Sequence, residues 1–225
     1  FRVRLGAYDD ALEEIDPNAT VVFVINHRSN MDYVLVTWLA AQRSTLSYAV
    51  GEWARIWPLS HLIRAMGAYF IRRKSRNPLY SRVLARYVQL ATAAGVTQAV
   101  FPEGGLSLDG RVAAPKLGLL SYVIAGADTQ QRDVVFVPVG LNYDRVIEDR
   151  ILTEAAQTGE RKFRASVPTA LRFAARWMWR RMRGTAHRFG FAAVSFGAPL
   201  SLKSVLADHR GDPTRYVASE LFRRI

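Results

Sequence analysis

Short apolar runs separated by polar residues recur along this chain of 225 residues and predict a series of buried strands. In the first, Val21 to Ile25 are β-branched or aromatic without polar interruption, a pattern typical of a strand buried on both faces of a sheet. The run at 134–139 is expected to end at Pro138. Other runs predict extended segments at residues 45–50, 67–73, 98–101 and 191–196.

Helical patterns lie between these runs. The segment 31–42 reads as an apolar helix that follows a possible N-cap at Ser29 or Asn30. A second helix is predicted at 78–94, because Asn77 suits its N-cap and Gly95 follows its end. Its apolar positions recur at three- and four-residue spacing, and we interpret them as a packing face: Leu79, Val83, Tyr87, Leu90 and Ala94. Further helical segments are expected within 51–66 with a break near Pro58, and at 117–127, 201–207 and 213–222.

The alternation of strands and helices predicts an α/β fold with a mostly parallel or mixed central sheet flanked by helices. No linker-like segment divides the chain, so we expect a single domain over residues 1–225. The first residue is Phe1 rather than Met, which is consistent with a piece cut from a longer protein.

The composition of the chain excludes several kinds of site and indicates the charge of its partner. The chain has no cysteine, which excludes disulfides, thiolate zinc sites and a cysteine nucleophile. Its four histidines are scattered singly, so we predict no metal site. We also expect no cofactor. A formal net charge of +12 implies an anionic partner, which could be a phosphorylated substrate, an anionic membrane surface or nucleic acid. No apolar run is long enough to span a bilayer, so any membrane contact is expected to be peripheral.

The elbow between the first strand and the first helix holds a candidate catalytic pair. His27 follows the strand, and Asp32 lies in the first turn of the helix. Asp32 can accept a hydrogen bond from one imidazole nitrogen and leave the other to take a proton from an alcohol. The structural alternative is an aspartate that complements the helix dipole beside an unrelated histidine.

Residues 20–150 resemble the glycerolipid acyltransferases through motifs that occur in the family's order. His27 and Asp32 form the H-x4-D box within NHRSNMDY, which is similar to the glycerol-3-phosphate acyltransferase version. The other motifs are GAYFIRR from Gly67, FPEGG from Phe101, PKLG from Pro115 and VPVGLNYDRV from Val137. The resemblance implies His27 as general base and Asp32 as the residue that orients it.

The resemblance also implies a set of substrate-binding residues. Arg73, with Arg72 as second choice, would bind the acceptor, and Pro138 would shape the acyl side. Where the family's loop usually carries two arginines, Leu106 and Leu108 stand here, so other cations would have to hold the phosphate. The full predicted set is Arg72, Arg73, Glu103, Gly104, Gly105, Lys116 and Pro138.

The segment 161–188 is the most basic part of the chain, with nine Lys or Arg and no acid. Arg172, Arg176, Arg180 and Arg183 share one helical face, and Leu171, Ala175, Met178 and Met182 share another. Cations with neighbouring tryptophans are typical of a helix that lies in a membrane interface. The alternative is a surface helix whose Met/Leu face packs on the core.

The resulting hypothesis is a transfer of a fatty acyl group from acyl-CoA or acyl-carrier protein to glycerol-3-phosphate, at the cytoplasmic face of a membrane. Attack on the thioester is expected to be direct, without an acyl-enzyme. Within the same family, a lysophosphatidate acyltransferase is the alternative. From another class, the alternative is a basic module that binds membrane or nucleic acid without catalysis, although nucleic acid is not the expected partner.

Overall fold

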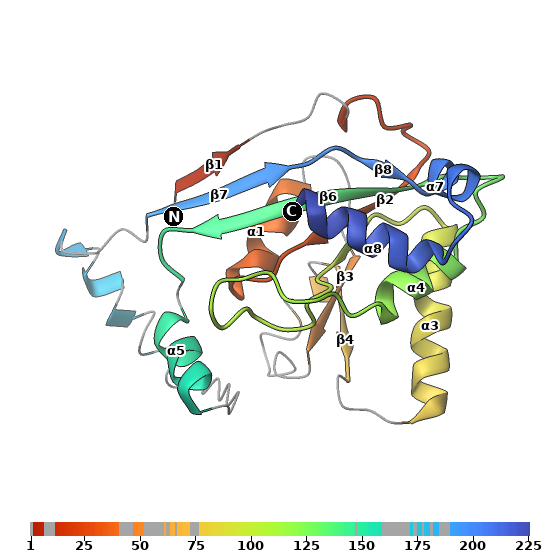
Figure 1. The fold of residues 1–225 in the computed structure, drawn as a ribbon. Helices are drawn as coiled ribbons and strands as arrows, with labels where there is room; N and C mark the ends of the chain where they lie inside the picture. Colours follow the sequence, from red (N-terminus) through yellow and green to blue (C-terminus); the bar gives the residue numbers. More distant parts are fainter. Residues whose placement is uncertain are drawn as a thin grey trace.

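The computed structural model describes residues 2–6, 12–40, 47–51, 61, 64–65, 67–72, 77–146, 148–158, 172, 175–176, 178–180, 182–184 and 190–225. These residues form an α/β fold around one mixed sheet (Figure 1). The strands are β1 (Arg2–Leu5), β2 (Thr20–Ile25), β3 (Ser47–Gly51), β4 (Ala68–Ile71), β5 (Gln98–Val100), β6 (Val134–Tyr143), β7 (Phe191–Phe196) and β8 (Leu200–Ser201). The helices are α1 (Met31–Ala40), α3 (Pro78–Ala93), α4 (Gly118–Ala125), α5 (Asp149–Thr158), α7 (Leu202–Asp208) and α8 (Pro213–Arg224).

The strand order in the sheet is β1-β7-β6-β2-β5-β3-β4, with β8 paired to β6. Five neighbouring strands, from β6 through β2, β5 and β3 to β4, are mutually parallel. Strands β7 and β8 run antiparallel to β6, which makes the sheet mixed. The predicted mixed α/β fold is therefore confirmed.

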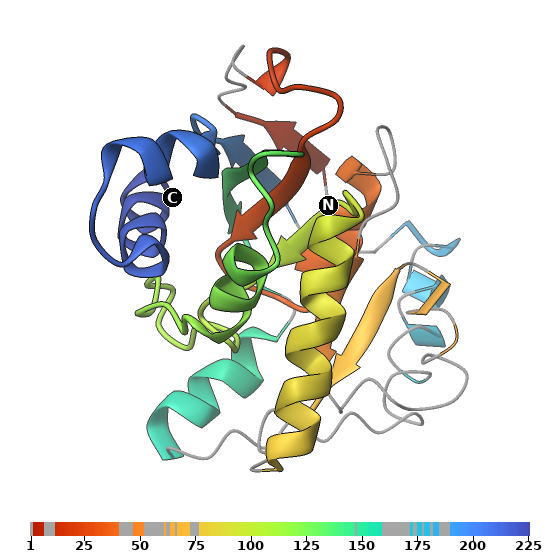
Figure 2. The same ribbon diagram turned by 90° about the vertical axis from the view of Figure 1, so that its right-hand side faces the viewer.

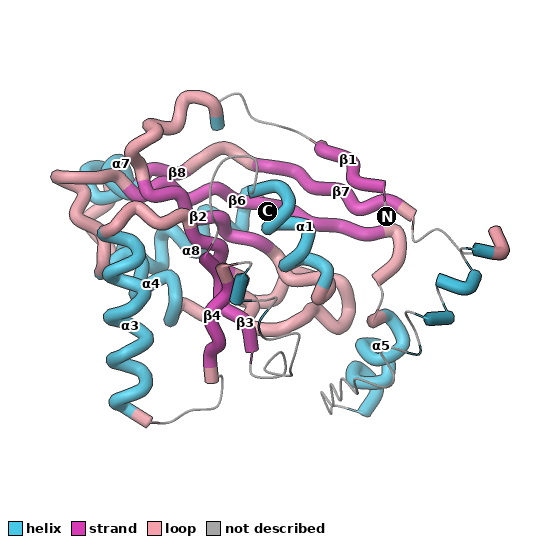
Figure 3. Tube along the Cα trace, turned by 180° about the vertical axis from the view of Figure 1, so that it is seen from behind, coloured by secondary structure: helices cyan, strands magenta, loops and turns pink. Residues whose placement is uncertain are grey.

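Helices cover both faces of the sheet. Along β2, Ile25 packs into one core cluster with Leu35 and Val36 of α1, whereas Val22 and Val24 pack into a second cluster. The second cluster includes residues of α3, α4, α7 and α8. The views in Figures 2 and 3 show α1 on one side of the sheet and α3, α4 and α8 on the other. The central strands are thus buried on both faces, as their uninterrupted apolar sequences predict.

Strand β6 corrects one prediction, since it runs through Pro138 and continues to Tyr143. On its β2 side, Pro138 lies opposite Val24 in the parallel ladder. On its other side, β8 pairs only up to Phe136 and β7 only from Val139 onward. Pro138 therefore occupies the gap between two antiparallel partners, where a proline without an N–H group is tolerated inside a strand.

Helix α3 corrects a second prediction. Its ends are as expected, because the Asn77 side chain accepts hydrogen bonds from two N–H groups of the first turn and Gly95 adopts a positive φ of 78° just past its end. The interpreted packing face, however, is largely exposed, with 68% of Leu79 and 59% of Val83 accessible to solvent. Val88 and Thr92 are buried instead. The helix carries a wider apolar arc than the sheet covers.

The remaining predicted elements within the described residues are confirmed with small shifts of their ends. Strands β1 and β8 and helix α5 were not predicted, because each is short or polar. Most of the predicted segments 51–66 and 161–188 lies outside the described residues.

Candidate active site

His27 and Asp32 meet at the carboxyl edge of the parallel strands. Strand β2 ends at Ile25 and α1 begins at Met31, so the elbow between them places the imidazole beside the first turn of the helix. The Nδ1 atom of His27 lies 2.9 Å from Oδ2 of Asp32. Because a carboxylate can only accept, the Nδ1–H group donates and Nε2 keeps its lone pair. The two side chains therefore have the geometry of a base and its orienting acid.

Asp32 is fully buried and is held by four donors. Its Oδ2 accepts from His27, from the Arg28 backbone N–H at 2.7 Å and from the Ser29 backbone N–H at 3.0 Å. Its Oδ1 accepts from the Tyr143 hydroxyl at 2.6 Å. These hydrogen bonds replace the hydration that a carboxylate loses on burial, so Asp32 is part of the folded core as well as of the site.

Aromatic rings enclose the other side of the imidazole. The Tyr33 hydroxyl donates toward Nε2 at 3.2 Å, and the Phe101 ring centroid lies 4.6 Å from that of His27. Tyr33 in turn stacks on Tyr48 of β3. His27 is only 2% exposed. A substrate hydroxyl that reaches Nε2 must take the position that the Tyr33 hydroxyl now fills.

The loop after β5 packs onto this pair through Glu103. Oε1 of Glu103 accepts the His27 backbone N–H at 2.7 Å, and Oε2 accepts the Ala113 N–H at 3.0 Å. The Ser107 N–H donates to the His27 carbonyl at 2.9 Å. Glu103 thus ties both ends of the loop to the elbow that holds His27, which is an organising contact made through backbone groups.

Two cations border this loop. Gly104 has a φ of 67°, a backbone conformation that favours glycine, and a Cβ atom there would lie 2.9 Å from Lys116 Nζ, so the lysine side chain lies directly against this glycine. Arg28, next to His27, donates through Nη1 to the Gly110 carbonyl. Its Nε is buried without a hydrogen-bond partner among the described residues. Arg28 and Lys116 therefore place two positive charges beside the elbow and the loop after β5.

Leu106 and Leu108, which stand where the resemblance predicts arginines, are not equivalent. Leu106 is 8% exposed and belongs to the core, whereas Leu108 is half-buried. Gly105 is also buried. The buried position of Leu106 favours an apolar side chain, because an unpaired arginine there would lose its hydration.

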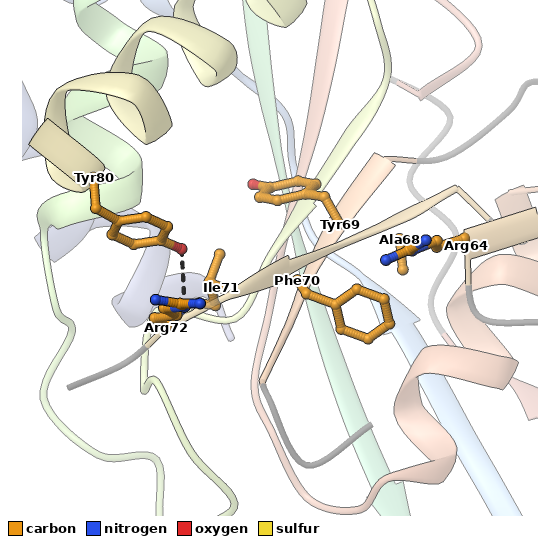
Figure 4. Close-up of a pocket in the computed structure, with 7 residues that line it drawn as sticks. All are labelled: Arg64, Ala68, Tyr69, Phe70, Ile71, Arg72 and Tyr80. Atoms are coloured by element: carbon orange, nitrogen blue, oxygen red, sulfur yellow. Dashed lines mark hydrogen bonds between the residues drawn. The ribbon is translucent and has the colours of Figure 1, made fainter. Parts of the chain in front are cut away.

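Arg72 lies at a distance from the pair. It follows β4, and β5 and β3 separate that strand from β2, so three inter-strand spacings of about 4.8 Å place it on the order of 14 Å away. A pocket of about 570 Å³ surrounds this edge (Figure 4). In it, the Tyr80 hydroxyl accepts the Arg72 backbone N–H at 2.8 Å. The described residues that line the pocket are Arg64, Ala68, Tyr69, Phe70, Ile71, Arg72 and Tyr80. Arg73 lies outside the described residues.

The structure therefore brings together His27, Asp32 and Glu103, while Gly104 and Gly105 follow Glu103 in the loop and Pro138 lies one strand away in β6. Sequence reasoning missed Tyr143, Tyr33 and Arg28, although all three stand inside the quoted motifs. It also missed Glu148, which accepts the Ser29 hydroxyl at 2.8 Å and the Asn30 N–H at 3.1 Å at the start of α1. A carboxylate at a helix N-terminus is a recognisable signal, but nothing in the sequence pairs it with this helix.

Neither a metal-binding cluster nor a membrane-spanning helix occurs in the described part of the chain. No group of three or more His, Asp or Glu residues there is arranged to hold a metal ion. No helix in the same residues combines the length and apolarity needed to cross a bilayer.

Comparison with known proteins gives consistent matches. Residues 9–142 match the sequence profile of the acyltransferase family. A glycerol-3-phosphate acyltransferase of Xanthomonas axonopodis pv. citri is 33% identical over 209 residues, and one of Aeromonas hydrophila is 35% identical over 193 residues. These alignments cover 90% and 84% of this chain but 22% and 23% of the relatives, so the chain spans less than a quarter of their length.

A solved structure shares the fold. The lysophosphatidate acyltransferase PlsC of Thermotoga maritima superposes with a TM-score of 0.57 at 21% identity, covering 99% of this chain and 70% of that chain. At this identity the likeness shows a common fold and carries no conclusion about the substrate.

Proposed function

We propose, from the premise that this chain belongs to the acyltransferase family, that it moves a fatty acyl group from a thioester donor to a hydroxyl of glycerol-3-phosphate. The observation that carries the proposal is the hydrogen bond of 2.9 Å between His27 and Asp32, with Nε2 facing a hydroxyl group. The names of the relatives support the choice of acceptor. The donor would be acyl-CoA or acyl-carrier protein, and the chemistry requires no other cofactor.

The proposed reaction needs one base. The acceptor hydroxyl replaces Tyr33 at Nε2 of His27 and gives up its proton as its oxygen attacks the thioester carbonyl. A C–O bond forms, the C–S bond breaks, and the imidazolium returns the proton to the leaving thiolate. Asp32 holds the imidazole and stabilises its charged form. Binding both substrates at one edge of the sheet would supply much of the rate.

Anion binding is proposed for the cations around this edge. Lys116 beside Gly104, and Arg28 beside His27, border the loop, whereas Arg72 could reach only the end of an acceptor remote from its reacting hydroxyl. A charge-assisted contact to phosphate is favourable for each of them. Arg73 is retained in the proposal on the family motif alone.

We also propose that the protein binds peripherally to the cytoplasmic face of a membrane with anionic lipids. The net charge of +12 supports this, as do the residues of 172–183 that the structure describes. Arg172, Arg176 and Arg180 are exposed, and so are Met178, Trp179 and Met182, so their apolar side chains are not packed on the core. Exposed apolar and cationic side chains together suit a lipid headgroup region.

The test is an acyl-transfer assay with glycerol-3-phosphate, dihydroxyacetone phosphate and lysophosphatidate, each with acyl-CoA or acyl-carrier protein. We expect transfer to glycerol-3-phosphate. Activity only with lysophosphatidate would assign the other acyltransferase reaction, and transfer to none of the three acceptors would reject the proposal.

The proposed role of His27 as general base is tested by substituting it. We expect His27→Ala to lower kcat by about 10²- to 10⁴-fold, the usual share of a positioned general base. His209→Ala is the matched control, since His209 stacks on Tyr216 beyond α7 and contacts no residue of the site. Near-normal turnover of folded His27→Ala would remove the histidine from the mechanism.

A further inference from the structure

Tyr143 is the residue at which a remote strand reaches the catalytic pair. In the parallel ladder, Ile25 at the end of β2 lies opposite Val139, so β6 continues four residues further to Tyr143. At about 3.3 Å per residue this overhang carries the tyrosine past the end of β2 to the level of α1. Its hydroxyl donates to Oδ1 of Asp32 at 2.6 Å.

The two carboxylate oxygens of Asp32 accept different numbers of hydrogen bonds. Oδ2 accepts three hydrogen bonds, including the one from His27. Among the described residues, Tyr143 supplies the single hydrogen bond that Oδ1 accepts. A short bond from a hydroxyl to a charged oxygen is one of the stronger hydrogen bonds in proteins. With one oxygen fixed from each side, the carboxylate cannot turn away from the imidazole.

The environment keeps Tyr143 a donor. Burial and the neighbouring charge of Asp32, with a smaller effect of Glu148, raise the pKa of the Tyr143 hydroxyl well above its ordinary value. The hydroxyl therefore stays protonated over the range in which enzymes are assayed. Antiparallel pairing with Ala192 of β7 fixes its backbone.

We propose that Tyr143 is a positioning residue of the acyl-transfer reaction, which holds Asp32 against His27 and draws negative charge toward Oδ1. The inference rests on the proposed function, because it assumes that His27 is the base. When the Tyr143 hydroxyl is removed, that charge returns to Oδ2, where the carboxylate stabilises the imidazolium more strongly.

Several other titratable or charged groups face His27 and Asp32. From α1 comes Tyr33, which donates to His27 Nε2. From the elbow and the loop after β5 come Arg28 and Glu103, and from the segment after β6 comes Glu148. All of them keep their contacts when only the Tyr143 hydroxyl is removed, so a change in the pH profile reports on that hydroxyl.

The variant is Tyr143→Phe, which keeps the ring. We expect kcat on the pH-independent plateau to fall about tenfold, the effect of losing one hydrogen bond to a charged group. KM for glycerol-3-phosphate should stay within about twofold, because the hydroxyl contacts Asp32 and not the acceptor. The acid limb of the kcat profile, where activity falls as the base is protonated, should move to higher pH. Tyr216→Phe, on the outer surface of α8, is the matched control and should change none of these values.

The outcomes separate this inference from the proposed function. If His27→Ala is inactive while Tyr143→Phe keeps the wild-type kcat and acid limb, the function stands and the positioning role is wrong. A raised KM with unchanged kcat would place Tyr143 on the substrate instead, and would also overturn it. If Tyr143→Phe does not fold, 4-aminophenylalanine at position 143 keeps the ring and puts an N–H donor in the place of the hydroxyl, and we expect it to keep an acid limb near that of the wild type; a shifted limb in that variant would overturn the role.

A second readout does not depend on activity. The ring protons of His27 can be followed by NMR against pH, and His27→Ala identifies their signals. We expect the titration midpoint of this ring to lie at higher pH in Tyr143→Phe than in the wild type. An unchanged midpoint would contradict the proposed charge withdrawal even if no acyl transfer were detected.

Discussion

At the scale of single residues, the site depends on a side chain that forms hydrogen bonds with the backbone of a neighbouring strand. Asn26, directly before His27, is 3% exposed. Its amide donates to the Leu141 carbonyl at 3.0 Å and accepts the Leu141 N–H at 2.6 Å. Because β2 has ended at Ile25, the Asn26 side chain continues the ladder between β2 and β6. The same overhanging part of β6 carries Tyr143 to Asp32, so these two contacts hold the catalytic elbow against one strand.

Removing the Asn26 amide should therefore destabilise the protein. In Asn26→Ala the two Leu141 groups lose their partners in a buried site, and we expect the free energy of unfolding to fall by about 2 to 4 kcal/mol. Urea unfolding at neutral pH measures it. The same substitution at the exposed Asn18 should change stability by less than about 0.5 kcal/mol. Equal small effects at both positions would mean that water replaces the amide.

At the scale of elements, α3 shows what a helical pattern leaves open. Its sequence has apolar residues on two adjoining stripes. Leu84 and Val88 pack against the core cluster that α4 also joins, while Leu79 and Val83 face outward. Tyr87 lies between, half exposed with its ring 5.0 Å from that of Tyr69. Periodicity identifies an apolar face, but the neighbours decide which part of a wide face is covered.

Because one stripe of α3 is exposed and the other buried, substitutions on the two stripes should affect the stability of the protein differently. Leu79→Gln and Val83→Gln should each change the free energy of unfolding by less than about 0.5 kcal/mol, because their side chains are already in water. Val88→Ala should cost about 2 kcal/mol through lost burial and a cavity. Denaturant unfolding of the three variants compares them. A cost at Leu79 or Val83 as large as that at Val88 would restore the original packing interpretation.

At the scale of the whole molecule, one group of exposed arginines lies beside exposed apolar side chains. The described arginines of 172–183 lie on a segment that also exposes Met178, Trp179 and Met182. Arg183 stacks over the Trp179 ring at 3.7 Å, which keeps a cation beside an aromatic side chain. Figure 1 places this segment at the end of the molecule away from α7 and α8. Residues 172–183 and helices α7 and α8 can therefore be compared as separate surfaces.

Membrane binding should depend on the described residues of 172–183. Changing Arg172, Arg176 and Arg180 together to Gln should weaken binding to vesicles rich in anionic lipid by about a hundredfold, since each basic residue contributes about 1 kcal/mol. The control changes Lys203, Arg210 and Arg215 to Gln, which removes the same charge from exposed positions at α7 and α8. Co-sedimentation measures both. Equal losses in the two triple variants would attribute binding to net charge rather than to residues 172–183.

The sequence by itself determined the central strands, most of the helices and the pairing of His27 with Asp32. Uninterrupted apolar runs specify strands that are buried on both faces, and Asn77, Pro78 and Gly95 specify the ends of a helix. His27 and Asp32 could be paired from sequence because one elbow holds both residues, so local geometry brings them together.

Only the tertiary structure decided the contacts between distant segments. Tyr143 is 111 positions from Asp32, and Glu103 is 76 positions from His27. Such pairs follow from strand order and register, and a shift of one residue in β6 would turn Tyr143 to the opposite face of the sheet. The extension of β6 beyond Pro138 likewise depended on where β7 and β8 pair with it. Local pattern fixes which residues form a strand, but its neighbours fix where the strand ends and what its last side chain touches.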